Sequence, residues 1–147
     1  MSDTKEPLSS LERTRALVEG RTDYKGIVHT LGLRGISVEE GFVVFEGTPS
    51  PAVYNPMGAV HGGYAATLLD TVMGLAVATR LAHDQGFTTL ELKVAYHRAM
   101  TEKTGPVRGE GEVVTFGRRA AFTEGRVVDD KGNLYATATS TCLVFTR

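Results

Sequence analysis

The stretch from Asn55 to Arg80 decides how this chain folds. It reads Asn-Pro-Met-Gly-Ala-Val-His-Gly-Gly-Tyr-Ala-Ala-Thr-Leu-Leu-Asp-Thr-Val-Met-Gly-Leu-Ala-Val-Ala-Thr-Arg. A glycine-rich turn leads directly into an almost wholly apolar segment that carries one carboxylate, Asp70. Apolar side chains on nearly every face indicate a helix that the rest of the chain surrounds. We therefore expect a long buried helix from His61 to Ala82.

The start of this helix is suited to binding a developing negative charge. The first N–H groups of a helix have no partners inside it, and the helix dipole favours an oxyanion there. Gly62 and Gly63 let a ligand approach the backbone closely. A lone acid on an apolar helix is costly unless it has a partner or a task. The turn and Asp70 together predict acyl-transfer chemistry.

The sequence before the helix predicts two shorter helices. Ser9 and Glu12 form a capping box that starts a helix ending at Gly20. A short helix from 23 to 31 follows, and Gly32 closes it. We expect one domain over 1–147, with 1–7 disordered and 8–31 as an N-terminal helical segment.

Strand patterns lie on both sides of the central helix. Leu90, Leu92, Val94 and Tyr96 alternate with polar or small residues, which is typical of a half-buried strand. The other expected strands are 33–38, 42–46, 107–116, 120–128 and 134–145. The predicted fold class is α+β, with a curved antiparallel sheet wrapped around a long central helix and an N-terminal helical extension.

Composition excludes several classes of protein. The net charge of −1 and scattered basic residues give no electrostatic footprint for nucleic acid. Asp70 in the middle of the apolar segment strongly disfavours membrane insertion. A single cysteine, Cys142, rules out an internal disulfide framework, and the N-terminus has no apolar core of a signal peptide. We therefore expect no nucleic-acid partner, no membrane and a cytoplasmic location.

The motifs of this chain match a known family. The pattern Asn55-x-x-Gly58-x-x-His61-Gly62-Gly63, with Asp70 nine residues after the histidine, resembles the hotdog-fold thioesterases of the phenylacetate-degradation (PaaI-like) type. Tyr96-His97-Arg98 and Gly117-Arg118-Arg119 also resemble that family. Ala99 departs from it, since a proline often follows the arginine. The helix before Gly20 is a second departure, because it is longer than the motif requires.

The resemblance implies a fold, an activity and an assembly. The fold is the hotdog fold. The activity is hydrolysis of an acyl-coenzyme A thioester, with an aryl- or fatty-acyl group and no cofactor. The assembly is a homodimer with shared active sites, usually paired into a homotetramer.

Five residues are the candidates for catalysis. The Gly62 N–H would bind the thioester carbonyl oxygen, and Asp70 would act as general base for water or as nucleophile. Asn55 would hydrogen-bond the thioester oxygen or the water. His61 would polarise the carbonyl or fix the Asn55 loop. Thr89 matches the family position of a hydroxyl that steadies the water. Alternation places Thr89 on the strand face opposite Leu90, Leu92 and Val94, and its neighbour Thr88 has the other phase, so the choice between the two threonines stays open.

Helix geometry indicates that two chains build one site. Gly62 and Asp70 are eight residues apart, which is roughly 12 Å along a helix axis. A reacting water and carbonyl must lie about 3 to 3.5 Å apart. If both residues serve one site, they must come from two chains whose helices run antiparallel, which requires a two-fold dimer.

Other residues are candidates for substrate binding. Gly63, Met57, Tyr64, Leu68 and Met73 are expected at the acyl pocket. Arg98, Arg118 and Arg119 are candidates for the coenzyme A phosphates, because arginine suits phosphate well.

Missing motifs narrow the alternatives. No Gly-x-Ser-x-Gly elbow is present. The four histidines show no paired ligand spacing and no Cys-x-x-Cys exists, so we expect no metal. Two alternatives to hydrolysis remain: a non-catalytic acyl-CoA-binding hotdog module, and a hotdog hydratase or dehydratase, which would need a histidine paired with an acid at one reacting centre. The identity of the acyl group and the role of the N-terminal helix are not evident from the sequence.

Overall fold

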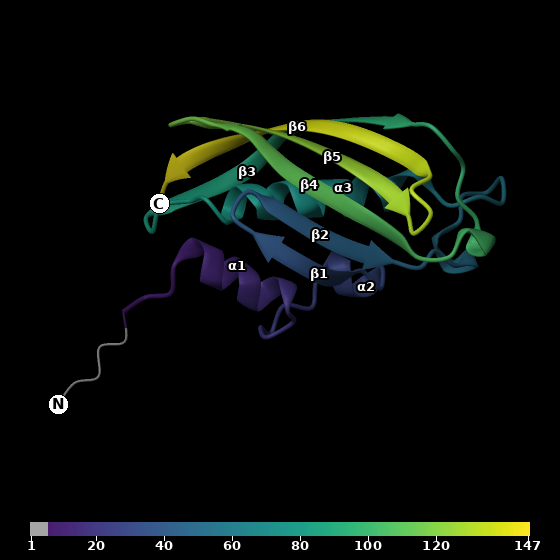
Figure 1. Ribbon diagram of the computed structural model, residues 1–147, viewed down its shortest axis with the longest axis horizontal. Helices are drawn as coiled ribbons and strands as arrows, with labels where there is room; N and C mark the ends of the chain where they lie inside the picture. Colours follow the sequence, from purple (N-terminus) through teal and green to yellow (C-terminus); the bar gives the residue numbers. More distant parts are fainter. Residues whose placement is uncertain (1–5) are drawn as a thin grey trace.

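The structure, a computed structural model, describes residues 6–147. A six-stranded antiparallel sheet in the order β1-β2-β4-β5-β6-β3 curves around the long helix α3 (Gly62–Ala78), as Figure 1 shows. The strands are β1 (Arg34–Glu39), β2 (Phe42–Gly47), β3 (Gln85–Tyr96), β4 (Val107–Phe116), β5 (Ala120–Asp129) and β6 (Leu134–Thr146). This arrangement confirms the predicted α+β hotdog fold.

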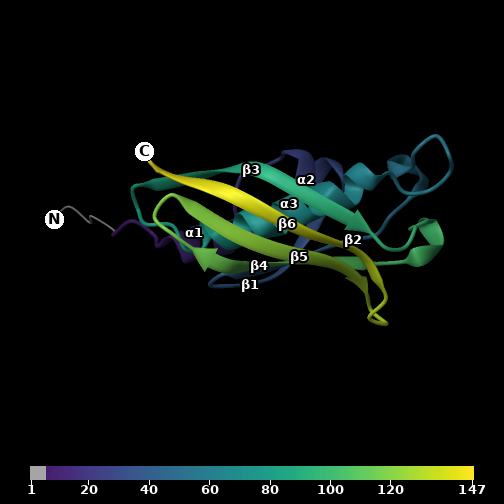
Figure 2. The same cartoon turned by 90° about the horizontal axis from the view of Figure 1, so that it is seen from above.

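Helix α3 is buried because the sheet closes around it. Six of its side chains are fully inaccessible: Leu68, Leu69, Val72, Met73, Ala76 and Val77. On β4, a Cβ atom at Gly111 would occupy the space of the Val72–Met73 backbone. Glycine at this position therefore lets the helix backbone lie directly against the sheet. Figure 2 shows α3 running beneath the sheet, with strands crossing over part of it.

The N-terminal segment packs against β1, on the lower side of Figure 1. Helix α1 (Ser10–Val18) begins with the predicted capping box of Ser9 and Glu12, which is confirmed. Helix α2 (Ile27–Thr30) is shorter than expected, because the chain becomes helical only after Gly26. The predicted disorder of 1–7 falls mainly on residues outside those the structure describes.

Helix α3 ends at Ala78, four residues before the predicted end at Ala82. The hydroxyl of Thr79 donates to the Ala76 carbonyl (2.6 Å) and accepts from the Gly41 N–H (2.8 Å). This buried threonine ties the helix end to the turn between β1 and β2. The apolar pattern continued past the helix end because Leu81 still packs against the core.

A β-bulge in β3 changes the face on which its residues lie. The register against β6 shifts between Thr89 and Glu91, and the bulged residue Leu90 is 59% exposed. A bulge inserts one residue and reverses the alternation beyond it. The prediction that Leu90 shares a face with Leu92 is therefore wrong, and so is the placement of Thr89 on the face opposite Leu92.

Two short 3-10 helices lie in the loops at the end of the molecule where α3 begins. They are η1 (Pro51–Val53) and η2 (Glu102–Thr104), and the Glu102 N–H donates to the Tyr54 hydroxyl between them (2.8 Å). Among the described helices, none has the length and apolar character needed to cross a membrane.

Candidate active site

His61 prepares the start of α3 by capping it. Its Nδ1 accepts a hydrogen bond from the Gly63 N–H (2.8 Å). The accepting nitrogen carries no proton, so the neutral ring holds its proton on Nε2 and presents it as a donor. The Gly63 N–H, a predicted substrate contact, is thereby already occupied by a side chain of the same turn.

The Gly62 N–H is the free donor at this helix start. Within residues 6–147 it has no hydrogen-bond acceptor, whereas the Gly62 carbonyl accepts from the Tyr96 hydroxyl (2.7 Å). A Cβ atom at position 62 would lie 2.9 Å from the Tyr96 oxygen, so a larger residue here would displace the exposed end of the Tyr96 side chain. Burial raises the pKa of Tyr96, which keeps its phenol protonated as a donor.

Asn55 holds the loop that leads into α3. Its Oδ1 accepts from the N–H groups of Met57 (3.0 Å) and Ala59 (3.2 Å). Its Nδ2 donates to no other group in the described part of the chain. Because Asn55 lines the same cavity as Gly62, this amide is available to a ligand there.

A cavity of about 390 Å³ lies at this end of the molecule. Arg98 lines it, with its guanidinium 5.9 Å from the centre of the Tyr135 ring, a cation–π arrangement. The Tyr135 hydroxyl donates to Asp129 (2.8 Å). The full lining is Asn55, Ala59, Val60, His61, Gly62, Ala65, Tyr96, His97, Arg98, Ala99, Met100 and Tyr135.

Asp70 lies in a second cavity, of about 200 Å³. Its Oδ1 accepts a hydrogen bond from the Thr89 hydroxyl (3.0 Å), and both side chains are half-buried. Thr88 is exposed on the other face of β3. The structure thus selects Thr89, rather than Thr88, as the partner of Asp70.

The two cavities are separate within one chain. They share no lining residue: the first contains Asn55, His61 and Gly62, and the second contains Asp70 and Thr89. A further hollow of about 760 Å³ lies on the outer face of the sheet among charged side chains and contains none of the predicted site residues.

Several predicted pocket residues lie elsewhere. Leu68 and Met73 are fully buried in the core, and Tyr64 is 3% exposed beneath β2. They were predicted from their apolar character, but on a helix apolar on all sides these positions face the sheet. Met57 is 82% exposed at the tip of its loop and lines neither cavity.

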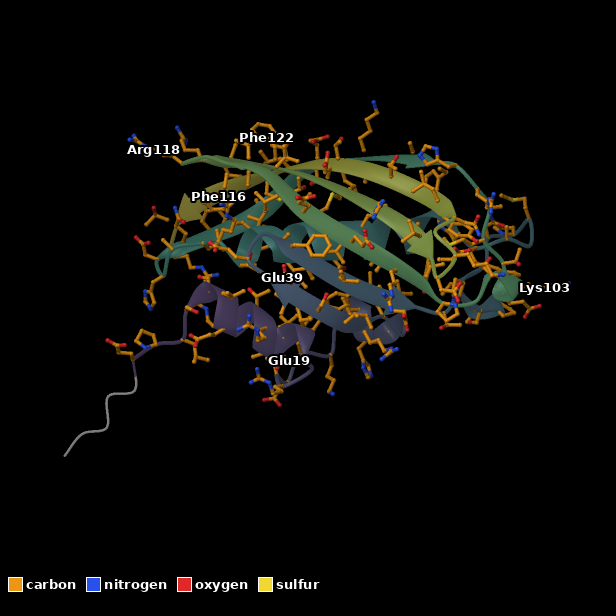
Figure 3. The ribbon with its side chains drawn as sticks, viewed as in Figure 1. Glu19, Glu39, Lys103, Phe116, Arg118 and Phe122 are labelled. Carbon is orange, nitrogen blue, oxygen red and sulfur yellow. The ribbon has the colours of Figure 1, made fainter. Side chains whose placement is uncertain are left out.

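Arg118 and Arg119 lie at the far end of the sheet from Gly62. They occupy the turn between β4 and β5 and line a shallow cavity with Gln85 and residues 143–146. Figure 3 places Arg118 at one end of the molecule and Lys103, which is near the start of α3, at the other. Within one chain only Arg98 is brought to the cavity that contains Gly62.

The sequence did not predict two residues that lie close to the candidate catalytic groups, Tyr96 beside Gly62 and Tyr24 beside Asp70. Tyr96 was noted only as part of a motif, although its hydroxyl fixes the Gly62 peptide. Its position at the end of β3, across from the helix start, could have suggested this contact. Tyr24 lines the Asp70 cavity, but no local pattern links it to a residue so distant in sequence. The described residues contain no group of three or more His, Cys, Asp and Glu side chains that could hold a metal ion.

Comparison with known proteins identifies the family of this chain. A family model described as the thioesterase superfamily matches residues 57–136, more than half of the chain. The chain belongs to the thioesterase superfamily. The match begins in the Asn55 loop and runs through α3 and β3 to the start of β6, so it covers both cavities' central residues. A thioester hydrolase is therefore the class of enzyme to which this chain belongs.

Two relatives and one crystal structure are similar to this chain over most of its length. The proofreading thioesterase EntH of Klebsiella pneumoniae is 29% identical over 82% of this chain and 86% of its own length. The 1,4-dihydroxy-2-naphthoyl-CoA hydrolase of Listeria monocytogenes is 26% identical over 81% of this chain and 95% of its own. The crystal structure of a phenylacetic acid degradation-related protein from Ralstonia eutropha superposes with a TM-score of 0.78 at 28% identity, covering 88% of this chain and 98% of that one.

Proposed function

We propose that this thioesterase-superfamily chain hydrolyses acyl-CoA thioesters at sites shared between two subunits. Asp70 of one subunit activates a water molecule, and the Gly62 N–H of the other binds the thioester carbonyl oxygen. The observation that carries the proposal is the pair of half-sites: a free N–H at the start of α3, and a carboxylate held by Thr89 eight residues further along. The CoA-thioester name of the Listeria relative supports the substrate class.

The distance between Gly62 and Asp70 along α3 requires a second subunit. Eight residues of α3 span about 12 Å, whereas a water and a carbonyl react from about 3 to 3.5 Å. A two-fold axis across antiparallel helices places the Asp70 half-site of one chain beside the Gly62 half-site of the other, and does so twice.

Strand β3 provides the edge for this dimer. It ends the sheet, so its outer side has unpaired backbone groups that can pair with a second copy. Thr89 contacts Asp70 and Tyr96 contacts Gly62, so the midpoint between the two half-sites lies near Leu92 and Lys93. The two-fold axis is expected near that midpoint.

Two registers of the β3–β3 pairing are possible, one with Leu92 and one with Lys93 on the two-fold axis, and the charged side chains of β3 favour one of them. Residues directly opposite one another in an antiparallel pair lie on the same face. With Lys93 on the axis, two lysines would be opposed, which is unfavourable. With Leu92 on the axis, Lys93 lies opposite Glu91 of the other chain on the outer face, twice. We therefore propose the register with Leu92 on the two-fold axis.

The reaction then follows from the placement of donors and acceptors. Asp70 accepts a proton from water while the water oxygen attacks the thioester carbon. The Gly62 N–H, with the Asn55 amide and the His61 Nε2–H nearby, stabilises the negative charge on the carbonyl oxygen. The carbon–sulfur bond breaks, the thiolate of coenzyme A leaves and takes up the proton, and the free acid remains.

Coenzyme A is expected on the side of the cavity that contains Arg98. Arg98 lines that cavity directly, and His97 lies beside it. Antiparallel pairing of β3 strands brings the Gln85 end of one chain to the Tyr96 end of the other, and Arg118 and Arg119 lie near Gln85. We propose that these two arginines contact the phosphates bound at the partner's Gly62 half-site.

Two dimers are expected to pair into the homotetramer that the resemblance to PaaI-like enzymes implies. The outer face of the sheet exposes three large apolar side chains, Leu90, Val114 and Phe122, at 49 to 59%. We propose this surface for the contact between dimers, since an exposed apolar cluster is typical of an interaction site.

Release of free coenzyme A from acyl-CoA substrates tests the proposal. We expect turnover of benzoyl-, phenylacetyl- or medium-chain acyl-CoA by the wild type, and loss of at least about 10³-fold in kcat in Asp70→Asn. Asp84→Asn, an acid in the loop after α3, is the matched control and keeps full activity. Binding of acyl-CoA without any turnover would instead support a binding module, and hydration of crotonyl-CoA would support a hydratase.

Labelled water separates the two roles left open for Asp70. In a single turnover in H₂¹⁸O, a general base sends the label directly into the acid product. A nucleophile forms an anhydride first. Water attack at the Asp70 carbonyl of that anhydride places the label in Asp70, whereas attack at its acyl carbon places the label in the acid product, as a general base does. Label detected by mass spectrometry in the peptide that contains Asp70 therefore shows the nucleophilic role.

A further inference from the structure

The cavity beside Asp70 has a wall that does not come from the hotdog motif. Leu17 of α1, Tyr24 of the following loop, and Ile27 and Val28 of α2 form its N-terminal side. Helix α3 and strand β3 form the remainder, through Asp70, Thr71, Gly74, Leu75, Phe87 and Thr89. The N-terminal segment thus folds back over the carboxylate from outside the family match, which begins at residue 57.

The two cavities differ in chemistry. The Asp70 cavity is walled by aliphatic and aromatic side chains, and its polar groups gather at one side, at Asp70, Thr71 and Thr89. The Gly62 cavity carries Arg98 and two histidines. A thioester joins an apolar acyl group to a phosphorylated carrier. Apolar surface gains free energy by leaving water, so the acyl group belongs on the Asp70 side.

Tyr24 closes this cavity at the rim. Its ring lies across Gly26, where any Cβ atom would overlap the phenol. Glycine at 26 therefore allows the ring to lie flat against the backbone at the start of α2. The side chain is 48% exposed, with one side toward solvent while it lines the cavity.

Phe87 closes the opposite side. Its ring packs against Gly74 of α3, where a Cβ atom would lie 3.2 Å from the ring. Phe87 itself packs against the hydrophobic core. Away from Phe87, the cavity extends toward the side chains of the N-terminal segment.

The volume of the Asp70 cavity limits the size of the acyl group that it can hold. The cavity measures about 200 Å³, and an apolar cavity of about 150 Å³ is known to hold a benzene molecule. One aromatic ring, or an acyl chain of similar volume, therefore fills such a space. A longer chain would have to displace Tyr24.

Resting on the proposed function, we propose that residues 17–28 form the acyl-selecting wall of this enzyme, and that Tyr24 sets the upper limit of acyl size. The N-terminal segment is then a specificity element that each chain adds to its own Asp70 half-site. Tyr24 is a specificity residue that touches the acyl group and takes no part in proton transfer.

Chain-length profiles of variants test the inference. The substrates are butyryl-, hexanoyl-, benzoyl-, decanoyl- and dodecanoyl-CoA, with kcat/KM measured for each. The wild type is expected to prefer hexanoyl- or benzoyl-CoA over dodecanoyl-CoA. Tyr24→Ala is expected to raise the ratio of decanoyl- to hexanoyl-CoA kcat/KM by about tenfold, the range that one or a few methylene contacts produce.

Two controls isolate the role of the ring. Tyr24→Phe keeps the ring and is expected to keep the wild-type profile. Leu134→Ala removes a partly exposed apolar side chain, 38%, at the start of β6, which lines neither cavity and lies outside the proposed contact between dimers, and is expected to leave the profile unchanged. If Tyr24→Ala does not fold, Ile27→Ala opens the same wall and is expected to shift the profile in the same direction.

The outcomes separate this inference from the proposed function. A wild type that hydrolyses no acyl-CoA overturns the proposed function. A wild type that hydrolyses acyl-CoA but prefers dodecanoyl-CoA, or wall variants whose ratio stays unchanged while both substrates are turned over, overturns only the inference about the N-terminal wall.

Discussion

Thr88 and Thr89 are neighbours on β3, but only Thr89 reaches Asp70. Its hydroxyl donates to Asp70 Oδ1 (3.0 Å), while Thr88 faces outward. Hydrogen bonds to charged groups contribute about 1.5 to 3 kcal/mol. A carboxylate that must accept a proton from water in one defined geometry depends on that contact for its orientation.

Thr89→Ala is therefore expected to reduce kcat by about tenfold to a hundredfold, with a smaller change in KM, because the bond orients the base rather than the substrate. Steady-state kinetics on the best acyl-CoA substrate measure both constants. Thr88→Ala is the matched control and should remain at the wild-type rate. Equal losses in the two variants would show that the contact with Asp70 is not the cause.

Residue types at the site were predictable, whereas their environments were not. The sequence motif was sufficient to single out Asn55, His61, Gly62 and Asp70, because few contexts place a glycine-rich helix start before a buried acid. It could not distinguish Leu68 and Met73, which are core, from residues that line a cavity. On a helix apolar on every side, the hydrophobic pattern does not indicate which face meets the substrate.

Among the helices and strands, β3 has the largest influence on the proposed site, because it is both the edge of the sheet and a wall of the Asp70 cavity. Periodicity predicted the three other long strands to within one residue, but of β3 it predicted only the part from Leu90 to Tyr96 and not residues 85–89. The bulge at Leu90 was not predictable from alternation, since one inserted residue leaves the pattern on each side intact. That bulge is what turns Thr89 toward α3.

The proposed register of β3 gives a crosslinking prediction. With Leu92 on the two-fold axis, a cysteine at that position lies opposite its own copy, so Leu92→Cys is expected to form a disulfide-linked dimer under mild oxidation. Val94→Cys is the control: it lies on the same face, but the two copies are separated by roughly 13 Å along the strands. Non-reducing gels with mass spectrometry read out the link.

The wild-type chain provides the background for this experiment. Its single cysteine, Cys142, is fully buried, and burial raises the pKa of its thiol, so it should not crosslink. Efficient crosslinking of Val94→Cys, with none at Leu92→Cys, would contradict the register.

At the scale of the whole molecule, Asp129 links the β5–β6 hairpin to the cavity that contains Gly62. It accepts hydrogen bonds from the Asn133 amide (2.8 Å), from backbone N–H groups in the hairpin and from the Tyr135 hydroxyl (2.8 Å). The Asn133 side chain is the largest cause that lowers the pKa of Asp129, from 3.8 to about 2. Tyr135 in turn packs beneath Arg98.

The Asp129 carboxylate makes the free energy of unfolding depend on pH. A folded-state pKa below the unfolded value means that its contribution is complete above about pH 4 and is lost as the pH falls toward 2. Asp129→Asn is expected to be less stable than the wild type at pH 7 and to show a shallower decline between pH 4 and 2. Urea unfolding midpoints across this range measure both, and parallel curves for the two proteins would contradict the assignment.

The two-chain assembly stays a prediction from geometry. If Gly62 and Asp70 serve one site, their spacing along a helix requires a second chain, and within one chain they lie in separate cavities. The folding of residues 17–28 over Asp70 was not predictable, because contacts between distant segments leave no periodic signal. The same limit applies to Tyr96 and Gly62.

Subunit complementation tests the shared site most directly. Asp70→Asn removes the base, and Gly62→Pro removes the N–H donor at the first helical position, where proline is compatible with a helix. Each variant alone is expected to be inactive as a folded dimer, which circular dichroism and sedimentation establish beforehand. Refolding the two together at equal amounts should restore about a quarter of wild-type activity, since half of the dimers then hold one intact site of two. Mixed dimers that form but remain as inactive as the separate variants would contradict a site built from two chains.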